Sequence, residues 1–293
     1  MANAPRHPGQ LAGLQLNRRQ LVAGATAGVF ASVAGFRSAQ AQAKIAPPNI
    51  IKADTLVMSI NPTLPPLQFV DDKGQLQGMR VELGNAVAKW LGLTPEYVRI
   101  EFAAMVPGLA AKRWDMINTG IFWTEERSKL MYMIPYERAA ISFLVAAGNP
   151  LKIAKWEDLS GKAVSVELGG IEERRTREVD DMLKKANLKG IEIRTFNNFA
   201  ESFQALRAGQ VQAATAIDAT AMYWQGRGDF TRAIAGLFPQ TATFAFADKT
   251  LALAVVDALN DLRKQGVYDA LFDKYGVLKI EEMTFSINGP GPA

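Results

Sequence analysis

Residues 101–136 read EFAAMVPGLAAKRWDMINTGIFWTEERSKLMYMIPY, and helix and strand signals alternate along them. Met105 and Leu109 lie four residues apart, which predicts one apolar face of a helix over 105–111. A short apolar strand at 115–118 follows, and the run TGIFWT then predicts a loop that opens a new helix. Alternation of this kind favours an α/β fold with a mainly parallel sheet.

Arg127 stands three residues after Thr124, in the first turn of a helix predicted over 124–131. Thr124 is a candidate N-cap, because its hydroxyl can accept a hydrogen bond from the N–H three residues on. A guanidinium beside the free N–H groups of a helix start suits an anion, since arginine grips a carboxylate through two parallel hydrogen bonds. An ordinary surface arginine in a first helical turn is the alternative.

The stretch resembles the polar-amino-acid-binding proteins of ABC importers, solute-binding protein family 3. These proteins carry a run of the form dfdalipaLqsGkyDlvisgmsiTpeR, with PY a short distance later. The matching residues here are Phe102, Pro107, Leu109, Asp115, Thr119, Gly120, Thr124, Glu126, Arg127, Pro135 and Tyr136. The resemblance extends over 54–278 and implies a two-lobed α/β periplasmic-binding-protein fold of type II. Each lobe is then a mainly parallel sheet flanked by helices.

The resemblance also implies how the chain divides into lobes. One lobe is expected to take residues 54–146 and 244–293, and the other residues 147–243. Residues 44–53 are expected to be a linker that precedes the first lobe. Two lobes joined by two extended crossovers can close on a ligand by rigid-body rotation.

Residues 1–43 predict an export signal that is cleaved near Ala43. The segment has no acidic residue and no lysine, and an arginine pair at 18–19 precedes a mild apolar run at 21–36. An A-x-A motif that ends at Ala43 matches a cleavage site. The arginine pair favours a twin-arginine signal, with a general secretion signal as the alternative. Either route predicts a periplasmic protein.

Charge and residue usage narrow the classes of function. The chain has 33 Lys and Arg against 29 Asp and Glu, and four of the arginines lie in 1–43, which leaves 29 of each sign in the rest. Binding of nucleic acid or anionic membranes by bulk charge therefore loses support. The one histidine, His7, lies in the signal and there is no cysteine, which excludes a histidine base and nearly every zinc or haem site. No metal and no cofactor are expected.

The resemblance implies ligand-binding positions one by one. Arg127 matches the arginine that binds the ligand carboxylate, and Thr119 with Gly120 matches the small polar turn beside it. Asn61 stands where some members keep an aspartate after the first strand. The apolar positions expected at the pocket wall, for which core packing is an equal alternative, are Leu64, Leu67 and Met105.

Four residues depart from the family pattern and predict a more apolar pocket. Phe122 stands where serine is usual, and Trp123 stands where an aliphatic residue is preferred. In the second lobe, Gly170 and Ile171 replace the two hydroxyl residues of a Gly-Thr-Thr anchor.

The aspartate that binds the ligand ammonium in the family would fall at Ile217. Asp218 comes one residue later, and side chains alternate along a strand, although a loop end could still bring Asp218 to the ligand. A buried ammonium without a matched carboxylate costs several kcal/mol. The sequence therefore predicts poor recognition of the α-amino group and a carboxylate ligand with a hydrophobic body.

The resemblance implies a monomeric, non-catalytic protein that captures a small carboxylate-bearing ligand, an amino acid or a related organic acid, between two closing lobes. Its partner is then the membrane permease of an ABC importer, with no nucleic acid involved. A ligand sensor is one alternative. Another is an enzyme resembling cyclohexadienyl (arogenate/prephenate) dehydratases, with Glu173 after the Gly-Gly pair as the acid. Glu172 and Glu173 also suit the first turn of a helix that continues with arginines.

Overall fold

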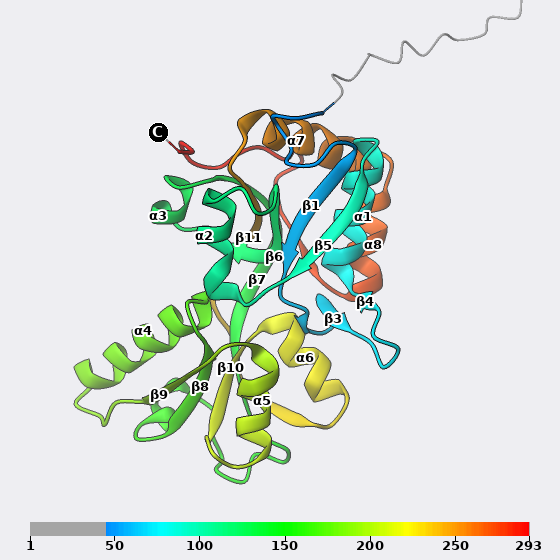
Figure 1. The fold of residues 1–293 in the computed structure, drawn as a ribbon. Coiled ribbons are helices and arrows are strands. Elements are labelled where there is room, and N and C mark those ends of the chain that lie inside the picture. The colour runs from blue at the N-terminus through cyan, green and yellow to red at the C-terminus, as the bar shows by residue number, and fades with distance from the viewer. Residues whose placement is uncertain (1–44, 293) are drawn as a thin grey trace, which may run out of the picture. The chain divides into compact units, whose positions relative to one another are not determined.

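The computed structural model describes residues 45–292, so the export signal predicted at 1–43 lies outside the described residues. The described chain folds around two groups of strands, which we call lobe 1 and lobe 2 (Figure 1). Two long strands belong to both groups and pair antiparallel with each other, β7 (Tyr132–Ala146) and β11 (Phe230–Phe246).

Lobe 1 is built on parallel strands, of which β1 (Thr55–Ile60) and β6 (Met116–Phe122) are fully buried. Its other strands are β5 (Thr94–Arg99) and the short β12 (Leu278–Lys279) on β7. All six residues of β1 are buried, as expected of a strand covered on both faces. A small antiparallel sheet after β1 contains β2 (Thr63–Leu64), β3 (Gln68–Val70) and β4 (Leu76–Gln77).

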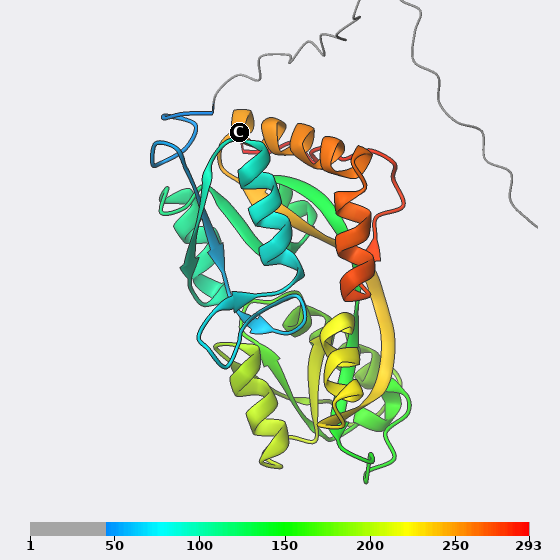
Figure 2. The same ribbon diagram turned by 90° about the vertical axis from the view of Figure 1, so that its right-hand side faces the viewer.

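Helices cover the sheet of lobe 1. Figure 2 shows three of them packed beside one another, α1 (Met79–Trp90), α7 (Lys249–Lys264) and α8 (Val267–Tyr275). Next to β6 lie a 3-10 turn (Phe102–Ala104) and the short helices α2 (Met105–Ala110) and α3 (Glu125–Ser128). Within residues 45–292, no helix has both the length and the apolar character needed to span a bilayer.

Helix α7 shows how the sequence sets this packing. Asp248 caps its start, because the carboxylate Oδ1 accepts from the Leu251 N–H at 2.8 Å. The buried side chains recur every three or four residues and face the core, namely Leu251, Ala252, Val255, Ala258, Leu259 and Leu262. Burying one leucine side chain of this kind contributes about 2 kcal/mol.

Lobe 2 repeats the α/β plan on a smaller scale. Its strands are β8 (Ala163–Glu167), β9 (Glu192–Phe196) and β10 (Ala213–Ile217), and β8 pairs in parallel with both others. Its helices are a 3-10 turn (Trp156–Leu159), α4 (Ile171–Lys185), α5 (Phe199–Arg207) and α6 (Asp218–Gly226). The predicted α/β fold with mainly parallel sheets is confirmed.

The two lobes join in one hydrogen-bonded strand order, β5-β1-β6-β11-β7-β10-β8-β9. Within β7, residues 141–144 pair with β10, whereas residues 137–138 pair with β12. The register of β11 against β7 shifts three times between Arg232 and Gln240. Irregular pairing of this kind lets strands bend. The lobe boundaries inferred from the sequence stay a prediction.

Two local predictions were wrong, and two elements were not predicted. The run TGIFWT is not a loop up to Phe122, because β6 leaves β1 and pairs with Ala242 and Thr243 of β11 instead. The helix predicted over 124–131 is the single turn α3, since Tyr132 already starts β7. Helix α6 and the first half of β11 were not anticipated.

Candidate functional site

Arg127 lies where α3 faces lobe 2. Its backbone N–H donates to Thr124 Oγ1 at 3.1 Å, which confirms Thr124 as the N-cap. Its guanidinium donates through Nη1 to the Phe122 carbonyl at 3.0 Å and through Nη2 to the Gly169 carbonyl at 3.2 Å. The guanidinium carbon is 5.5 Å from the centre of the Phe102 ring, within range of a cation–π contact. Arg127 therefore contacts both lobes.

The charge of Arg127 is only partly compensated. Burial lowers the pKa of its guanidinium, and the nearby Glu172 carboxylate opposes that shift. Arginine nevertheless stays protonated at neutral pH, because its ordinary pKa is so high. Among residues 45–292, no carboxylate lies within ion-pair distance of Arg127. A guanidinium has five N–H donors, so this one can bind an anion in addition to its two carbonyl partners.

Asn61 makes a second bridge between the lobes. Its Nδ2 donates to Glu167 Oε1 at 2.6 Å, and both residues are only 3% exposed. The backbone N–H of Asn61 donates to Thr119 Oγ1 at 3.3 Å, and its Oδ1 accepts from Thr63 Oγ1 at 3.1 Å. The predicted positions Asn61 and Thr119 are thus brought together, where β1 ends and in the middle of β6.

Two buried carboxylates flank Gly170 at the start of α4. A Cβ added to Gly170 would lie 2.5 Å from Glu172 Oε2 and 3.6 Å from Glu167 Oε2, so both carboxylates lie close to the Gly170 backbone. Burial raises the pKa of Glu167 well above its usual range. Burial also raises the pKa of Glu172 to about 7, against the opposing effects of its own N–H, Arg127 and Arg80.

Sequence reasoning missed both glutamates. Glu167 ends an apolar strand, where an acidic residue is unusual, and that position was the available signal. Glu172 was interpreted as a favourable charge at a helix start, which does not distinguish an exposed side chain from a buried one.

Glu173, the residue suggested as a catalytic acid, is bonded to groups within α4 and just before it. Its Oε2 accepts from the Gly169 N–H at 2.9 Å, and its Oε1 pairs with Arg177 Nη2 at 2.6 Å. These contacts match the structural alternative. The preceding residue, Glu172, is buried, and burial raises its pKa.

Thr119 and Gly120 both contact the side chain of Arg80. Thr119 Oγ1 accepts from Gln68 Nε2 at 2.9 Å, and the Thr119 carbonyl accepts from Arg80 Nη1 at 2.5 Å. Gly120 has a φ of +73°, and a Cβ there would lie 2.1 Å from Arg80 Cζ. Gly120 is therefore needed for the close approach of the guanidinium.

Arg80 forms a fully buried ion pair with Glu137 of β7. Arg80 Nε donates to Glu137 Oε2 at 3.0 Å and Nη2 donates to Oε1 at 3.1 Å, and neither side chain is exposed. Arg80 Nη1 also donates to Gln68 Oε1 at 3.0 Å. Through these bonds Arg80 links α1, β3, β6 and β7. The pair therefore holds the backbone of Thr119 and Gly120 in place, and we call this group of contacts the floor of the site.

The predicted apolar residues lie in hydrophobic cores. The side chains concerned, all at most 4% exposed, are Leu64, Leu67, Met105, Phe122, Ile171 and Ile217. Trp123 is only partly buried, and its Nε1 donates to the Asn288 carbonyl at 3.1 Å. A ligand contact by any of these residues stays a prediction.

Asp218 is the first residue of α6 and points to the crossover strands. It forms an ion pair with Arg232 of β11 and accepts a hydrogen bond from Ser142 of β7. Its charge is therefore balanced within lobe 2, and a role in binding a ligand ammonium stays a prediction.

A solvent-accessible hollow lies beside Arg127. It is lined from lobe 1 by Trp123, Thr124, Glu125 and Glu126, from α4 by Arg174 and Arg175, and from β11 by Gln240 and Thr241. Across it, Arg174 Nη1 approaches Glu126 Oε2 at 3.5 Å, an exposed pair between the lobes. Within residues 45–292, no group of histidine, cysteine, aspartate or glutamate side chains is arranged to hold a metal ion.

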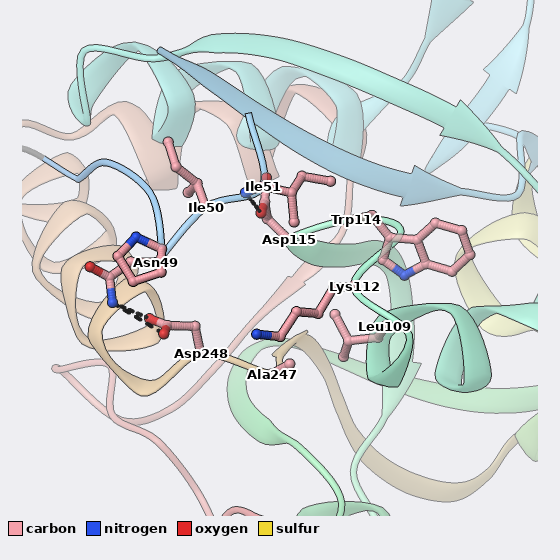
Figure 3. Close-up of a pocket in the computed structure, with 10 residues that line it drawn as sticks. Asn49, Ile50, Ile51, Leu109, Lys112, Trp114, Asp115, Ala247 and Asp248 are labelled. Carbon is pink, nitrogen blue, oxygen red and sulfur yellow. Dashed lines mark hydrogen bonds between the residues drawn. The ribbon is translucent and has the colours of Figure 1, made fainter. Parts of the chain in front are cut away.

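A second pocket, on lobe 1, has a structural explanation (Figure 3). Asn49 Nδ2 donates to Asp248 Oδ2 at 3.2 Å. Asp115 accepts from the backbone N–H groups of Ile51 at 2.8 Å and Val57 at 2.9 Å. These bonds hold the segment before β1, the predicted linker, against lobe 1.

Comparison with known proteins gives a consistent result. The family model described as bacterial extracellular solute-binding proteins, family 3, matches residues 56–277. The L-cystine-binding protein TcyJ of Escherichia coli (strain K12) is 30% identical over 226 residues, which cover 75% of this chain and 82% of that protein. The lysine/arginine/ornithine-binding periplasmic protein of the same strain is 29% identical over 246 residues, covering 76% and 87%.

Solved structures show the same fold. An ancestral arginine-binding protein bound to glutamine has a TM-score of 0.68 and 31% identity, covering 76% of this chain and 98% of that one. The ancestral amino acid-binding protein AncCDT-1, a precursor of cyclohexadienyl dehydratase, has a TM-score of 0.66 and 29% identity, covering 76% and 95%. The named relatives are binding proteins.

Proposed function

The chain belongs to the bacterial extracellular solute-binding proteins, family 3, and on that premise we propose that it captures an amino acid or a related organic acid between its lobes. It delivers that ligand to the permease of an ABC importer, as a periplasmic monomer whose residues 1–43 are the export signal. The observation that carries the proposal is Arg127, which contacts carbonyl groups of both lobes and has no carboxylate partner within residues 45–292.

In the proposed site, Arg127 binds the ligand carboxylate. A bidentate pair with a guanidinium is geometrically specific and stronger than a neutral hydrogen bond. Since Arg127 also donates to Gly169 of lobe 2, a ligand on its guanidinium sits where both lobes meet. Such a ligand favours the closed arrangement by its higher affinity for that state.

The amino end of the ligand has candidate partners as well. The expectation of poor amino recognition relied on the absence of a matched carboxylate, and the structure places Glu167 and Glu172 beside Gly170. Both carboxyl groups are buried, and burial raises their pKa values. A ligand ammonium placed beside them would favour their ionised forms, and the ionised carboxylates would in turn stabilise the ammonium. We therefore propose that the ligand carries an ammonium group as well as a carboxylate.

Arg127→Ala is expected to weaken ligand binding at least tenfold, about 1.4 kcal/mol, because the charge-assisted pair is lost. Arg127→Lys restores the charge but not the two parallel hydrogen bonds, so we expect intermediate affinity. A panel of L-amino acids that includes L-arginine and L-cystine identifies the ligand by its effect on melting temperature, and calorimetry then gives the affinities. X-ray scattering should show a smaller radius of gyration with ligand for the wild type and no change for Arg127→Ala.

The control for that experiment is Arg113→Ala, which removes an exposed arginine of lobe 1. It should bind as the wild type does. Wild-type affinity in Arg127→Ala would move the carboxylate site elsewhere. An unchanged radius at saturation of the wild type would contradict lobe closure.

Glu172→Gln should reduce the preference for an amino acid over its deaminated acid. Because the charged form of Glu172 increases as the pH rises through about 7, the affinity of the wild type for the amino acid should rise roughly tenfold between about pH 6 and pH 8. The variant should show a flat profile over this interval. Calorimetry of both ligands tests this, with Glu173→Gln as the matched control.

If the deaminated acid binds as tightly as the amino acid at both pH values, the ammonium proposal is wrong and the original expectation of an apolar pocket is correct.

A dehydratase is the second candidate function, because Glu172 is a buried carboxyl group whose pKa is raised to about 7 and such a group can act as a general acid. Binding without catalysis has more support, since Glu173 is occupied by Gly169 and Arg177. Incubation with prephenate and arogenate, followed by detection of the dehydrated product, separates the two functions. A ligand sensor differs from an importer subunit in its partner alone, so co-purification with a permease separates those.

A further inference from the structure

The chain continues past the residues that match the family. The match ends at residue 277, whereas the structure describes contacts up to Gly291. After β12, Phe285 is buried, and its N–H donates to Asn260 Oδ1 at 2.9 Å. Asn260 Nδ2 in turn donates to the Phe285 carbonyl at 3.2 Å. This exchange fastens the start of the tail to α7.

From there the tail reaches the segment that contains Arg127. The Asn288 N–H donates to the Met133 carbonyl at 2.8 Å, and Trp123 Nε1 donates to the Asn288 carbonyl at 3.1 Å. The Gly291 N–H donates to the Ser128 carbonyl at 2.9 Å. The tail is therefore hydrogen-bonded to three places around α3: Trp123 before its cap, Ser128 at its last residue, and Met133 in β7.

Two glycines let the tail approach this closely. A Cβ on Gly289 would lie 2.4 Å from Ser128 Cβ, and a Cβ on Gly291 would lie 2.1 Å from Tyr132 Cε1. Both glycines have positive φ, +104° and +78°, a conformation that other residues adopt with strain. The close packing of the tail against α3 and Tyr132 thus requires residues without a side chain at positions 289 and 291.

Helix α3 depends on outside support because it is very short. It spans four residues, far below the roughly 12 residues at which an isolated helix becomes even marginally stable. The Thr124 cap holds one end of α3, and the tail bonds to the other end. Arg127 lies between these two supports.

We infer that residues 285–292, here called the C-terminal strap, position α3 so that the guanidinium of Arg127 stays directed at lobe 2. The strap residues are positioning residues and do not contact the ligand themselves. The inference rests on the proposed function for its effect on binding, and its effect on α3 is independent of the ligand.

Gly291→Ala tests the strap, because it places a methyl group against the Tyr132 ring. Gly228→Ala is its matched control, since Gly228 has the same φ of +78° and no atom within 4 Å of an added Cβ. We expect hydrogen exchange of the ligand-free protein to speed up at least tenfold at the amides of Arg127, Ser128 and Met131 in Gly291→Ala alone. With L-arginine and L-cystine as probes, the same variant should bind at least fivefold more weakly.

Adding Tyr132→Ala removes the ring that the new methyl group meets. In that background Gly291→Ala should change exchange and affinity less than it does in the wild type, because the contact with the ring is gone and only the backbone strain of the positive φ remains. Wild-type exchange at α3 in Gly291→Ala, or equal acceleration at every amide, would overturn the inference. If neither probe binds the wild type, arginine and cystine are excluded as ligands, while the exchange result still decides the strap.

Discussion

Replacing Arg80 by methionine is expected to lower the free energy of unfolding by about 3–5 kcal/mol. The substitution leaves Glu137 buried without its cation, and Gln68 and the Thr119 carbonyl lose a donor. An uncompensated buried charge costs far more than the lost hydrogen bonds alone. Urea unfolding followed by circular dichroism measures the effect.

Arg138→Met is the matched control, because Arg138 is the neighbour of Glu137 and forms an exposed ion pair with Glu281. We expect that variant to lower the free energy of unfolding by less than about 1 kcal/mol. The double variant Arg80→Met with Glu137→Leu should recover much of the loss, since it removes both buried charges. Equal costs for Arg80→Met and Arg138→Met would show that the buried pair does not support the floor of the site.

The second large effect concerns the pH dependence of stability through Glu172. In the unfolded chain a glutamate loses its proton near pH 4.3, whereas in the folded protein burial raises the pKa of Glu172 to about 7. Between these values the folded state keeps a proton that the unfolded state releases, so rising pH favours unfolding. The shift corresponds to roughly 3 kcal/mol lost between about pH 4 and pH 8, and Glu167 acts in the same direction.

Glu172→Gln should flatten this decline and be more stable than the wild type at about pH 8. Urea unfolding of the ligand-free protein at a series of pH values gives the slope directly. Glu173→Gln is the matched control, because it makes the same substitution at the next residue of α4, where the side chain is partly exposed and paired with Arg177. A wild-type slope in Glu172→Gln would refute the assignment of this titration.

Local patterns predicted the elements whose signal lies within a few residues. The helix that begins at Met105 was predicted from two apolar residues four positions apart, and the Thr124 cap followed from a spacing of three residues. The resemblance gave the position of Gly120, but its physical reason, the guanidinium of Arg80, comes from a helix 40 residues earlier. Such contacts are not visible in a local pattern.

The two buried glutamates could not be recognised for the same reason. Whether Glu167 is exposed or buried is decided by Asn61, which lies 106 residues away in the other lobe. Asp218 was similarly ambiguous, because its partners Ser142 and Arg232 come from two different crossover strands. The run TGIFWT has turn-forming residues, and pairing with β11 overrides that preference.

The hydrogen bond from Asn61 to Glu167 affects how well a permease can distinguish the ligand-bound protein from the empty protein. A hydrogen bond made by protein groups alone stabilises closed lobes whether or not a ligand is present. Each 1.4 kcal/mol gained this way raises the population of closed but empty protein about tenfold. Such molecules would compete with loaded ones at the permease, so the bridge from Asn61 to Glu167 adds to the background above which the ligand is detected.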